Sequence, residues 1–134
     1  MQASLVWFTI FTLMSVAAER VQFRITGRNL PDSDVIHTID PYVRVYYSGN
    51  NVPGEKFLGK TEYVFNSPNA QWNTIFTLNY VPGSNQTINL KLYDKDPGLD
   101  NLIGQSSFSL DDYKNKGEKA VMHLDAGTLI VKKA

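Results

Sequence analysis

Apolar and polar side chains alternate along several short stretches of the chain. Residues 21–25 read Val-Gln-Phe-Arg-Ile, and within residues 42–47 Val43, Val45 and Tyr47 recur at every second position. A period of two places the apolar side chains on one face of a strand, so each stretch predicts a strand with one buried face. With further β-rich runs between turn-forming segments, the pattern predicts eight strands, at residues 21–25, 42–47, 57–65, 72–80, 88–93, 103–108, 119–124 and 128–132.

These strands leave little room for helices. Only residues 110–113 could form a helical turn, and no longer stretch carries a helical period. Short strands at regular spacing favour an all-β fold, an eight-stranded antiparallel β-sandwich, over an α/β fold. Ile88, Leu90 and Leu92 then belong to the core rather than to a ligand surface, and residues 19–134 form one domain.

The amino-terminal segment, residues 1–18, contains no charged side chain. Its apolar stretch, residues 5–16, is followed by the small residues Ala17 and Ala18 and then by Glu19. This layout predicts a secretory signal peptide cleaved after Ala17 or Ala18, and hence a secreted, extracellular protein. A membrane anchor is the weaker alternative, because a bilayer-spanning helix needs roughly 20 apolar residues. A buried amino-terminal strand or helix of the mature fold is the other alternative.

Composition excludes several functions. The chain carries 13 basic and 13 acidic side chains, with a formal net charge of +0, whereas general nucleic-acid binding requires a basic surface. Cysteine is absent, which excludes thiol catalysis, thiolate metal sites and disulfide scaffolds. The sequence Asn85-Gln86-Thr87 follows the turn-forming residues 81–84, so Asn85 is a candidate glycosylation acceptor on an exposed loop.

Acidic residues concentrate in two of the connections between strands. They are Asp32, Asp34 and Asp40 in the first connection and Asp94, Asp96 and Asp100 in the second, where Asn101 closes the loop. A dense set of uncompensated carboxylates resists joint ionisation and therefore indicates a bound cation. Oxygen ligands without Cys or a His pair favour a hard ion, and a flexible multi-carboxylate site suits Ca²⁺ better than Mg²⁺. Because Asp, Pro and Gly also form ordinary turns, a solvated turn at residues 94–98 is the alternative interpretation.

Four motifs in order resemble the C2 domain family. They are DPYVRV at residues 40–45 after NLP at 29–31, KT at 60–61, residues 69–73 ending in Trp72-Asn73 with Phe76 beyond, and LYDKD at 92–96 followed by LIG at 102–104. The resemblance covers nearly all of residues 21–134. It implies a sandwich whose three loops at one end hold Ca²⁺ and dock on phospholipid, in the second of the family's two circularly permuted topologies. By overall pattern the chain resembles the C2 domain at the carboxyl end of perforins.

The resemblance also implies a set of metal ligands. Asp34 and Asp40 match the two first-loop ligands, and the two aspartates of LYDKD match the first two ligands of the third loop. Where C2 domains often place the final Asp, three residues before the Gly, this chain has Asn101, with Asp100 one position earlier. The expected ligands are therefore Asp34, Asp40, Asp94, Asp96, Asp100 and Asn101, with either of the last two completing the site. Weak binding suffices outside the cell, where calcium modules work at a Kd of about 10⁻⁴ to 10⁻³ M.

Apolar residues adjoin these ligands. Val35 and Ile36 at the first loop tip, and Leu99 in the third loop, are unusual in exposed turns, which indicates tips that contact a membrane or, alternatively, pack on each other. Without Ca²⁺ the acidic loops repel anionic lipid, whereas a bound ion neutralises them and offers coordination positions to a lipid phosphate.

Three cations could assist at one sheet face. Arg44, Lys60 and Lys91 could project toward lipid headgroups, although three such bases more often form a solvated face. Neither histidine is an expected site residue. His123 is expected to be exposed on a strand, and His37 to be a solvated loop residue.

Two functions are compatible with the sequence, and neither is enzymatic, since no nucleophile elbow, Gly-rich phosphate loop or substrate cleft is indicated. The first is a secreted calcium-binding module that docks on anionic phospholipid membranes in a calcium-dependent manner. The second is an extracellular protein-interaction or matrix module in which calcium is only structural or absent. Nucleic acid is not an expected partner of either.

Overall fold

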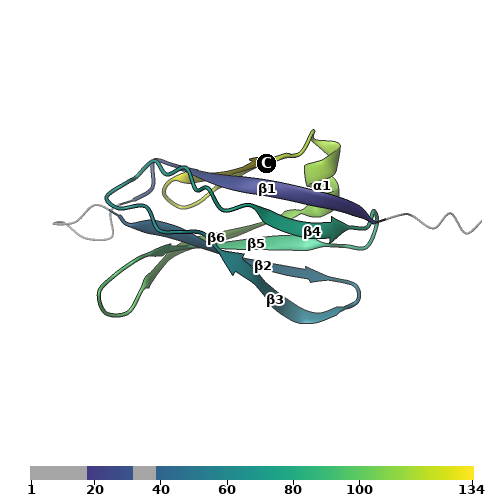
Figure 1. Cartoon of the computed structure of the whole chain (residues 1–134), viewed down its shortest axis with the longest axis horizontal. Helices are drawn as coiled ribbons and strands as arrows, with labels where there is room; N and C mark the ends of the chain where they lie inside the picture. Colours follow the sequence, from purple (N-terminus) through teal and green to yellow (C-terminus); the bar gives the residue numbers. More distant parts are fainter. Residues whose placement is uncertain (1–17, 32–38) are drawn as a thin grey trace, which may run out of the picture.

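The computed structural model describes residues 18–31 and 39–134 (Figure 1). They form eight strands and one short helix: β1 (Glu19–Arg28), β2 (Pro41–Gly49), β3 (Val52–Lys60), β4 (Phe76–Tyr80), β5 (Thr87–Asp94), β6 (Asn101–Ser109), α1 (Leu110–Asn115), β7 (Lys119–His123) and β8 (Thr128–Lys133). The predicted eight-stranded antiparallel sandwich is confirmed. Within these residues, no helix is long and apolar enough to cross a bilayer. The predicted signal peptide falls on residues 1–18, of which 1–17 lie outside the described residues.

The strands form two four-stranded sheets. Sheet A has the order β4-β1-β8-β7 and sheet B the order β3-β2-β5-β6. In Figure 1, β1 and β4 lie in the upper layer, and β2, β3 and β5 in the lower layer. All the paired strands are antiparallel. The last strand, β8, pairs with both β1 and β7, so the carboxyl-terminal residues complete the middle of sheet A.

Alternating side chains fill the space between the sheets. Along β1, Val21, Phe23 and Ile25 are buried while the residues between them are exposed, as the pattern predicts. The predicted core residues of β5 are also buried. Phe23 stacks on Phe76 with ring centroids 5.4 Å apart, which joins β1 to β4 through the core. Burial of this apolar surface is the main term that holds the two sheets together.

Two predicted strands differ in extent from the structure. The composition of residues 57–65 predicts one strand, yet β3 ends at Lys60, and β4 begins at Phe76 rather than at residue 72. Between them, the Val64 amide donates to the Pro41 carbonyl and the Ser67 amide to the Ile39 carbonyl, whereas residues 70–72 bond to residues 25–27 of β1 through the backbone. The segment therefore closes one end of the sandwich.

Trp72 fixes this segment to the core. Its side chain is only 2% exposed, and its indole Nε1 donates to the Pro41 carbonyl oxygen at 3.1 Å. A large aromatic group with a satisfied polar atom favours burial over a place on a strand surface. Trp72 thus anchors the connection to the first residue of β2.

Candidate metal and membrane-contact site

Three connections meet at one end of the sandwich, which we call the loop pole. It comprises residues 39–41, 61–70 and 94–101, at the left in Figure 1. Asp40 joins all three: its amide donates to Asp94 Oδ1 at 2.9 Å, its Oδ1 accepts from the Asn66 amide at 2.7 Å, and its carbonyl accepts from the Lys95 amide at 2.9 Å. Residues more than 50 positions apart in the sequence are thereby held side by side.

Asp94 lies at the centre of the loop pole. It is the last residue of β5 and is only 7% exposed. In the sheet B register it stands opposite Pro41 of β2 on one side and opposite Asn101 of β6 on the other. Directly opposed residues of an antiparallel pair have neighbouring side chains on the same face. Asn101 is therefore placed beside Asp94.

Asp100 is already engaged by several donors. Its Oδ2 accepts from the Tyr42 hydroxyl at 2.6 Å, and its Oδ1 accepts from the Asp96 amide at 3.1 Å and lies 3.6 Å from Lys95 Nζ. The Tyr42 hydrogen bond, followed by the Asp96 amide, lowers the pKa of Asp100 below its usual value. Burial, together with the Asp100 carboxylate, raises the pKa of Tyr42 to about 12. The loop before β6 is thus fixed by a charged hydrogen-bond network.

The structure brings the expected metal ligands together in two groups. Asp40, Asp94 and Asn101 are neighbours, and Asp96 contacts Asp100 within the third loop. Across residues 18–31 and 39–134, no three acidic or histidine side chains are close enough to form a metal site. Asp34, Val35 and Ile36, like Asp32 and His37, lie outside the described residues. The described donors are all oxygens, which fits a hard cation, and a site of several carboxylates needs the first-loop acid as well.

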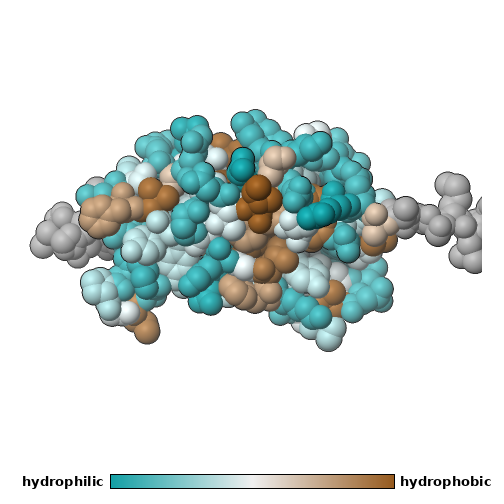
Figure 2. Space-filling view, viewed as in Figure 1, coloured by the Kyte–Doolittle hydropathy of each residue, from teal (hydrophilic) through white to brown (hydrophobic). Residues whose placement is uncertain are grey.

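Large apolar side chains lie exposed at the loop pole. Leu99 is 88% exposed, as predicted for a loop tip, and Phe65 is 75% exposed in the connection that contacts Asp40. Figure 2 shows brown atoms at the outer ends of two loops at this end of the molecule. Phe65 is not among the predicted loop tips, because the composition of residues 57–65 predicts a strand. The turn-forming residues Asn66 to Asn69 directly after it were the signal for a loop tip.

The three cations predicted on one sheet face do share it. Arg44 stands opposite both Lys60 and Lys91 in the sheet B register. Lys91 Nζ lies 3.5 Å from Glu55 Oε2 and 4.4 Å from the Tyr46 ring centroid, and the Arg44 guanidinium lies over the Phe57 and Tyr93 rings. Two of the three charges are therefore engaged by neighbouring side chains of the domain itself.

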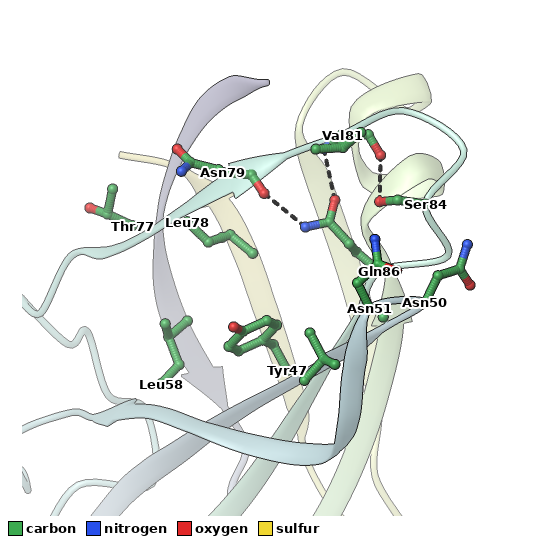
Figure 3. A pocket seen from close by; sticks show the side chains of 12 residues that line it. Tyr47, Asn50, Asn51, Leu58, Thr77, Leu78, Asn79, Val81, Ser84 and Gln86 are labelled. Carbon is green, nitrogen blue, oxygen red and sulfur yellow. Dashed lines mark hydrogen bonds between the residues drawn. The ribbon is translucent and has the colours of Figure 1, made fainter. Parts of the chain in front are cut away.

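A cleft of about 420 Å³ opens at the other end, where β3 and β4 face each other across the two sheets (Figure 3). It is lined by Tyr47, Gly49, Asn50, Asn51, Val52, Leu58, Thr77, Leu78, Asn79, Val81, Ser84 and Gln86. None of these is Asp, Glu, His, Lys or Arg. The Gln86 side chain closes the β4–β5 turn, because its Oε1 accepts from the Val81 backbone amide and its Nε2 donates to the Asn79 carbonyl.

Two further predicted residues are exposed. His123 is exposed on β7, as predicted, with its Nδ1 3.3 Å from the Thr128 hydroxyl. Asn85 is exposed in the β4–β5 turn with φ 59°. An exposed turn is accessible to modification, and glycosylation of Asn85 stays a prediction.

An antiparallel sandwich with acidic and apolar residues on the loops at one end defines the class of protein. The model of the C2 domain family matches residues 21–124, and the chain therefore belongs to the C2 domain family. The predicted resemblance is confirmed at the level of this family, and the closer resemblance to perforins stays a prediction.

Two relatives of the chain come from a plant. The chain is 29% identical over 86 residues to Multiple C2 domain and transmembrane region protein 8 of Arabidopsis thaliana, which covers 64% of this chain and 8% of the relative. It is 30% identical over 100 residues to Synaptotagmin-3 of Arabidopsis thaliana, covering 74% and 18%. The chain thus spans only a small part of these relatives.

Solved structures share the fold. A C2 domain of plant Extended Synaptotagmin 1 matches with a TM-score of 0.64 and 21% identity, covering 86% of this chain and 95% of that chain. Human GIVD cytosolic phospholipase A2 in complex with an inhibitor and terbium chloride matches with a TM-score of 0.67 and 18% identity, covering 88% and 18%. Calcium-bound Extended-Synaptotagmin 2 matches with a TM-score of 0.58 and 17% identity, covering 84% and 45%.

Proposed function

We propose that this protein is a secreted calcium-binding C2 module that docks on anionic phospholipid membranes when calcium is bound. The observation that carries the proposal is the contact between Asp40 and Asp94, which joins the acidic connections of two distant segments at the loop pole. We propose a binding module rather than an enzyme, because these acidic residues lie at the loop pole and not in the cleft between β3 and β4.

The described residues can supply part of a calcium site. Asp40, Asp94 and Asp96 would hold the ion, Asp34 would complete the set from the first loop, and Asp100 or Asn101 would close it. The ion supplies positive charge at a pole that is otherwise acidic, and it leaves coordination positions for a lipid phosphate. The chain's own contribution is to hold Asp94 buried between β2 and β6, so its carboxylate is oriented before any ion binds.

The exposed apolar tips support membrane docking. Phe65 and Leu99 lie on two connections of the same pole, and each would contribute roughly 1.5–3 kcal/mol if fully buried in lipid. Val35 and Ile36 would add a third tip. Such contributions supplement the ion without forming a permanent anchor.

Secretion is the part of the proposal that rests on residues 1–18. Expression of the full chain in a cell with a secretory pathway, followed by mass spectrometry of the medium, tests it. We expect a product that begins at Ala18 or Glu19. Retention in the cell with an intact amino terminus would contradict it.

Calcium titration with thermal unfolding tests the metal site. A ligand that binds only the folded state raises the Tm by mass action, so we expect the Tm to rise at millimolar calcium. Asp94→Asn with Asp96→Asn should abolish the rise. The matched control, Glu55→Gln with Asp112→Asn, removes two exposed acids away from the loop pole and should keep it. An unchanged rise in the first variant would refute the ligand assignment.

Liposome sedimentation tests the membrane partner. Vesicles containing phosphatidylserine should bind more protein with calcium than with chelator, and vesicles of phosphatidylcholine alone should not. A calcium-induced rise in Tm without any gain in vesicle binding would instead favour an extracellular protein-interaction module in which calcium is structural.

A further inference from the structure

The outer face of sheet A carries a one-sided set of charges. Its outward positions are Arg20, Gln22, Arg24, Thr26 and Arg28 of β1, Thr77 and Asn79 of β4, Lys119, Val121 and His123 of β7, and Thr128, Ile130 and Lys132 of β8. Five of these residues are Arg or Lys, and none is Asp or Glu. Because the whole chain has a formal net charge of +0, the residues outside this face carry an excess of negative charge. We call these outward positions the basic face.

The strand register places three of the cations in one row. Arg24 stands opposite Lys132, and Lys132 stands opposite Lys119. Neighbouring strands are about 4.8 Å apart, so this row spans roughly 10 Å across β1, β8 and β7. Arg20 and Arg28 extend the charge along β1, each about 13 Å from Arg24 at ~3.3 Å per residue.

These charges have no carboxylate partner nearby. In the described part of the chain, no ion pair includes Arg20, Arg24, Arg28, Lys119 or Lys132. The contrast with sheet B is clear, because there Lys91 pairs with Glu55 and Arg44 lies over two aromatic rings. Unpaired cations on one face create a positive potential that attracts an anionic surface.

We propose that the basic face is a second membrane-binding surface, which holds anionic phospholipid without calcium. It goes beyond the proposed function, since it uses neither the loop pole nor a metal. Charge complementarity identifies the partner, because each Lys or Arg near an anionic leaflet is attracted to it. The face lies along the side of the sandwich, whereas the loop pole lies at its end (Figure 1).

The apolar content of the basic face favours a bilayer over a dissolved polyanion. Thr26, Ile130 and Val121 form the row next to the cations, and Val121 is 47% exposed. A bilayer surface accommodates such side chains between its headgroups. No outward position holds Phe, Tyr or Trp, the residues on which single-stranded nucleic acids stack.

Vesicle sedimentation in chelator tests the proposal. The protein is mixed with phosphatidylserine-containing vesicles at low ionic strength, with phosphatidylcholine vesicles as reference, and then at about 1 M salt, where the Debye length falls to roughly 3 Å. We expect binding to the anionic vesicles alone, and its loss in high salt. Arg24→Gln with Lys119→Gln and Lys132→Gln should weaken this binding roughly 100-fold, since each removed cation weakens it about fivefold.

The control is Lys56→Gln with Lys116→Gln, two exposed lysines outside the basic face and outside the sheet B face of Arg44. This variant should bind within about threefold of the unmodified protein, since it keeps all five cations of the face. Absence of binding in chelator, or an equal loss in both variants, would overturn the proposal. Tighter binding to heparin or to single-stranded DNA than to vesicles would also overturn it. If the protein binds vesicles in chelator but gains no binding when calcium is added, the result would contradict only the calcium-dependent docking proposed for the loop pole.

Discussion

The hydroxyl of Tyr42 donates a 2.6 Å hydrogen bond to Oδ2 of Asp100, which connects the start of β2 with the loop that precedes β6. The two residues are 58 positions apart. Tyr42 is buried and stacks on Tyr93 with ring centroids 5.5 Å apart, so its hydroxyl is held in place from the strand side. The third loop is therefore tied to the sandwich in the absence of any ion.

Removing the Tyr42 hydroxyl should reduce stability in a pH-dependent way. The hydrogen bond lowers the pKa of Asp100, so its stabilising contribution is present above the unfolded-state pKa of about 3.9 and is lost as the pH falls through the folded-state pKa. We expect Tyr42→Phe to lower the free energy of unfolding by about 1.5–2 kcal/mol at neutral pH, the lower part of the range for bonds to charged groups. The difference should shrink at pH ~3.

Urea unfolding at the two pH values measures this difference. Tyr63→Phe is the matched control, because Tyr63 is 54% exposed, and it should leave the free energy of unfolding nearly unchanged. An equal loss for Tyr42→Phe at acidic and neutral pH would show that packing, not the bond to Asp100, is responsible.

Asn101 offers a second test, because it faces Asp94 across β5 and β6. Asn101→Asp adds a carboxylate beside the buried Asp94, which should raise calcium affinity several-fold, since affinity grows with ligand charge. The same change should lower the Tm in chelator, because like charges on neighbouring strands repel. Calorimetric titration and thermal unfolding measure the two effects. A lower Tm without a gain in affinity would assign the final ligand to Asp100 instead.

Much of the fold follows from local patterns. Alternation in β1, β2 and β5 predicted half-buried strands, and the order of four motifs predicted the family. The connection between β3 and β4 could not be predicted in this way, because β-favouring residues there are held by Trp72 and by single backbone bonds. These depend on tertiary contacts.

The candidate site, like the fold, is predicted only in part by local sequence patterns. Spacing alone grouped the carboxylates by loop, but the contact of Asp40 with Asp94 and the engagement of Asp100 by Tyr42 depend on register between strands. Part of the basic face can be predicted from the sequence. Arg20, Arg24 and Arg28 are four residues apart, and side chains separated by an even number of residues lie on the same face of a strand. The lysines of β7 and β8 on this face can be identified only once the order of the strands in sheet A is known.

Trp72 links the core to the loop pole. Its Nε1 holds the Pro41 carbonyl, next to Asp40, so Trp72→Phe removes a buried hydrogen bond as well as part of the packing. We expect the free energy of unfolding to fall by about 2–4 kcal/mol, because a buried hydrogen bond is lost and a partial cavity is left. Calcium affinity should fall as well. A stability loss without any change in calcium affinity, measured where the variant is fully folded, would show that Asp40 is positioned independently of Trp72.

The exposed apolar tips should govern membrane affinity without affecting the metal. Phe65→Ala and Leu99→Ala should each weaken calcium-dependent vesicle binding by roughly 10- to 100-fold, the equivalent of about 1.5–3 kcal/mol for a side chain buried in lipid. Because both side chains are exposed in the free protein, the Tm and the calcium affinity should stay within error of the unmodified chain. Ile75→Ala, a truncation at a 45% exposed residue outside the loop pole, serves as the control and should bind normally. If Phe65→Ala binds as well as the control while Leu99→Ala does not, then the connection between β3 and β4 remains outside the lipid and docking is confined to the other loops.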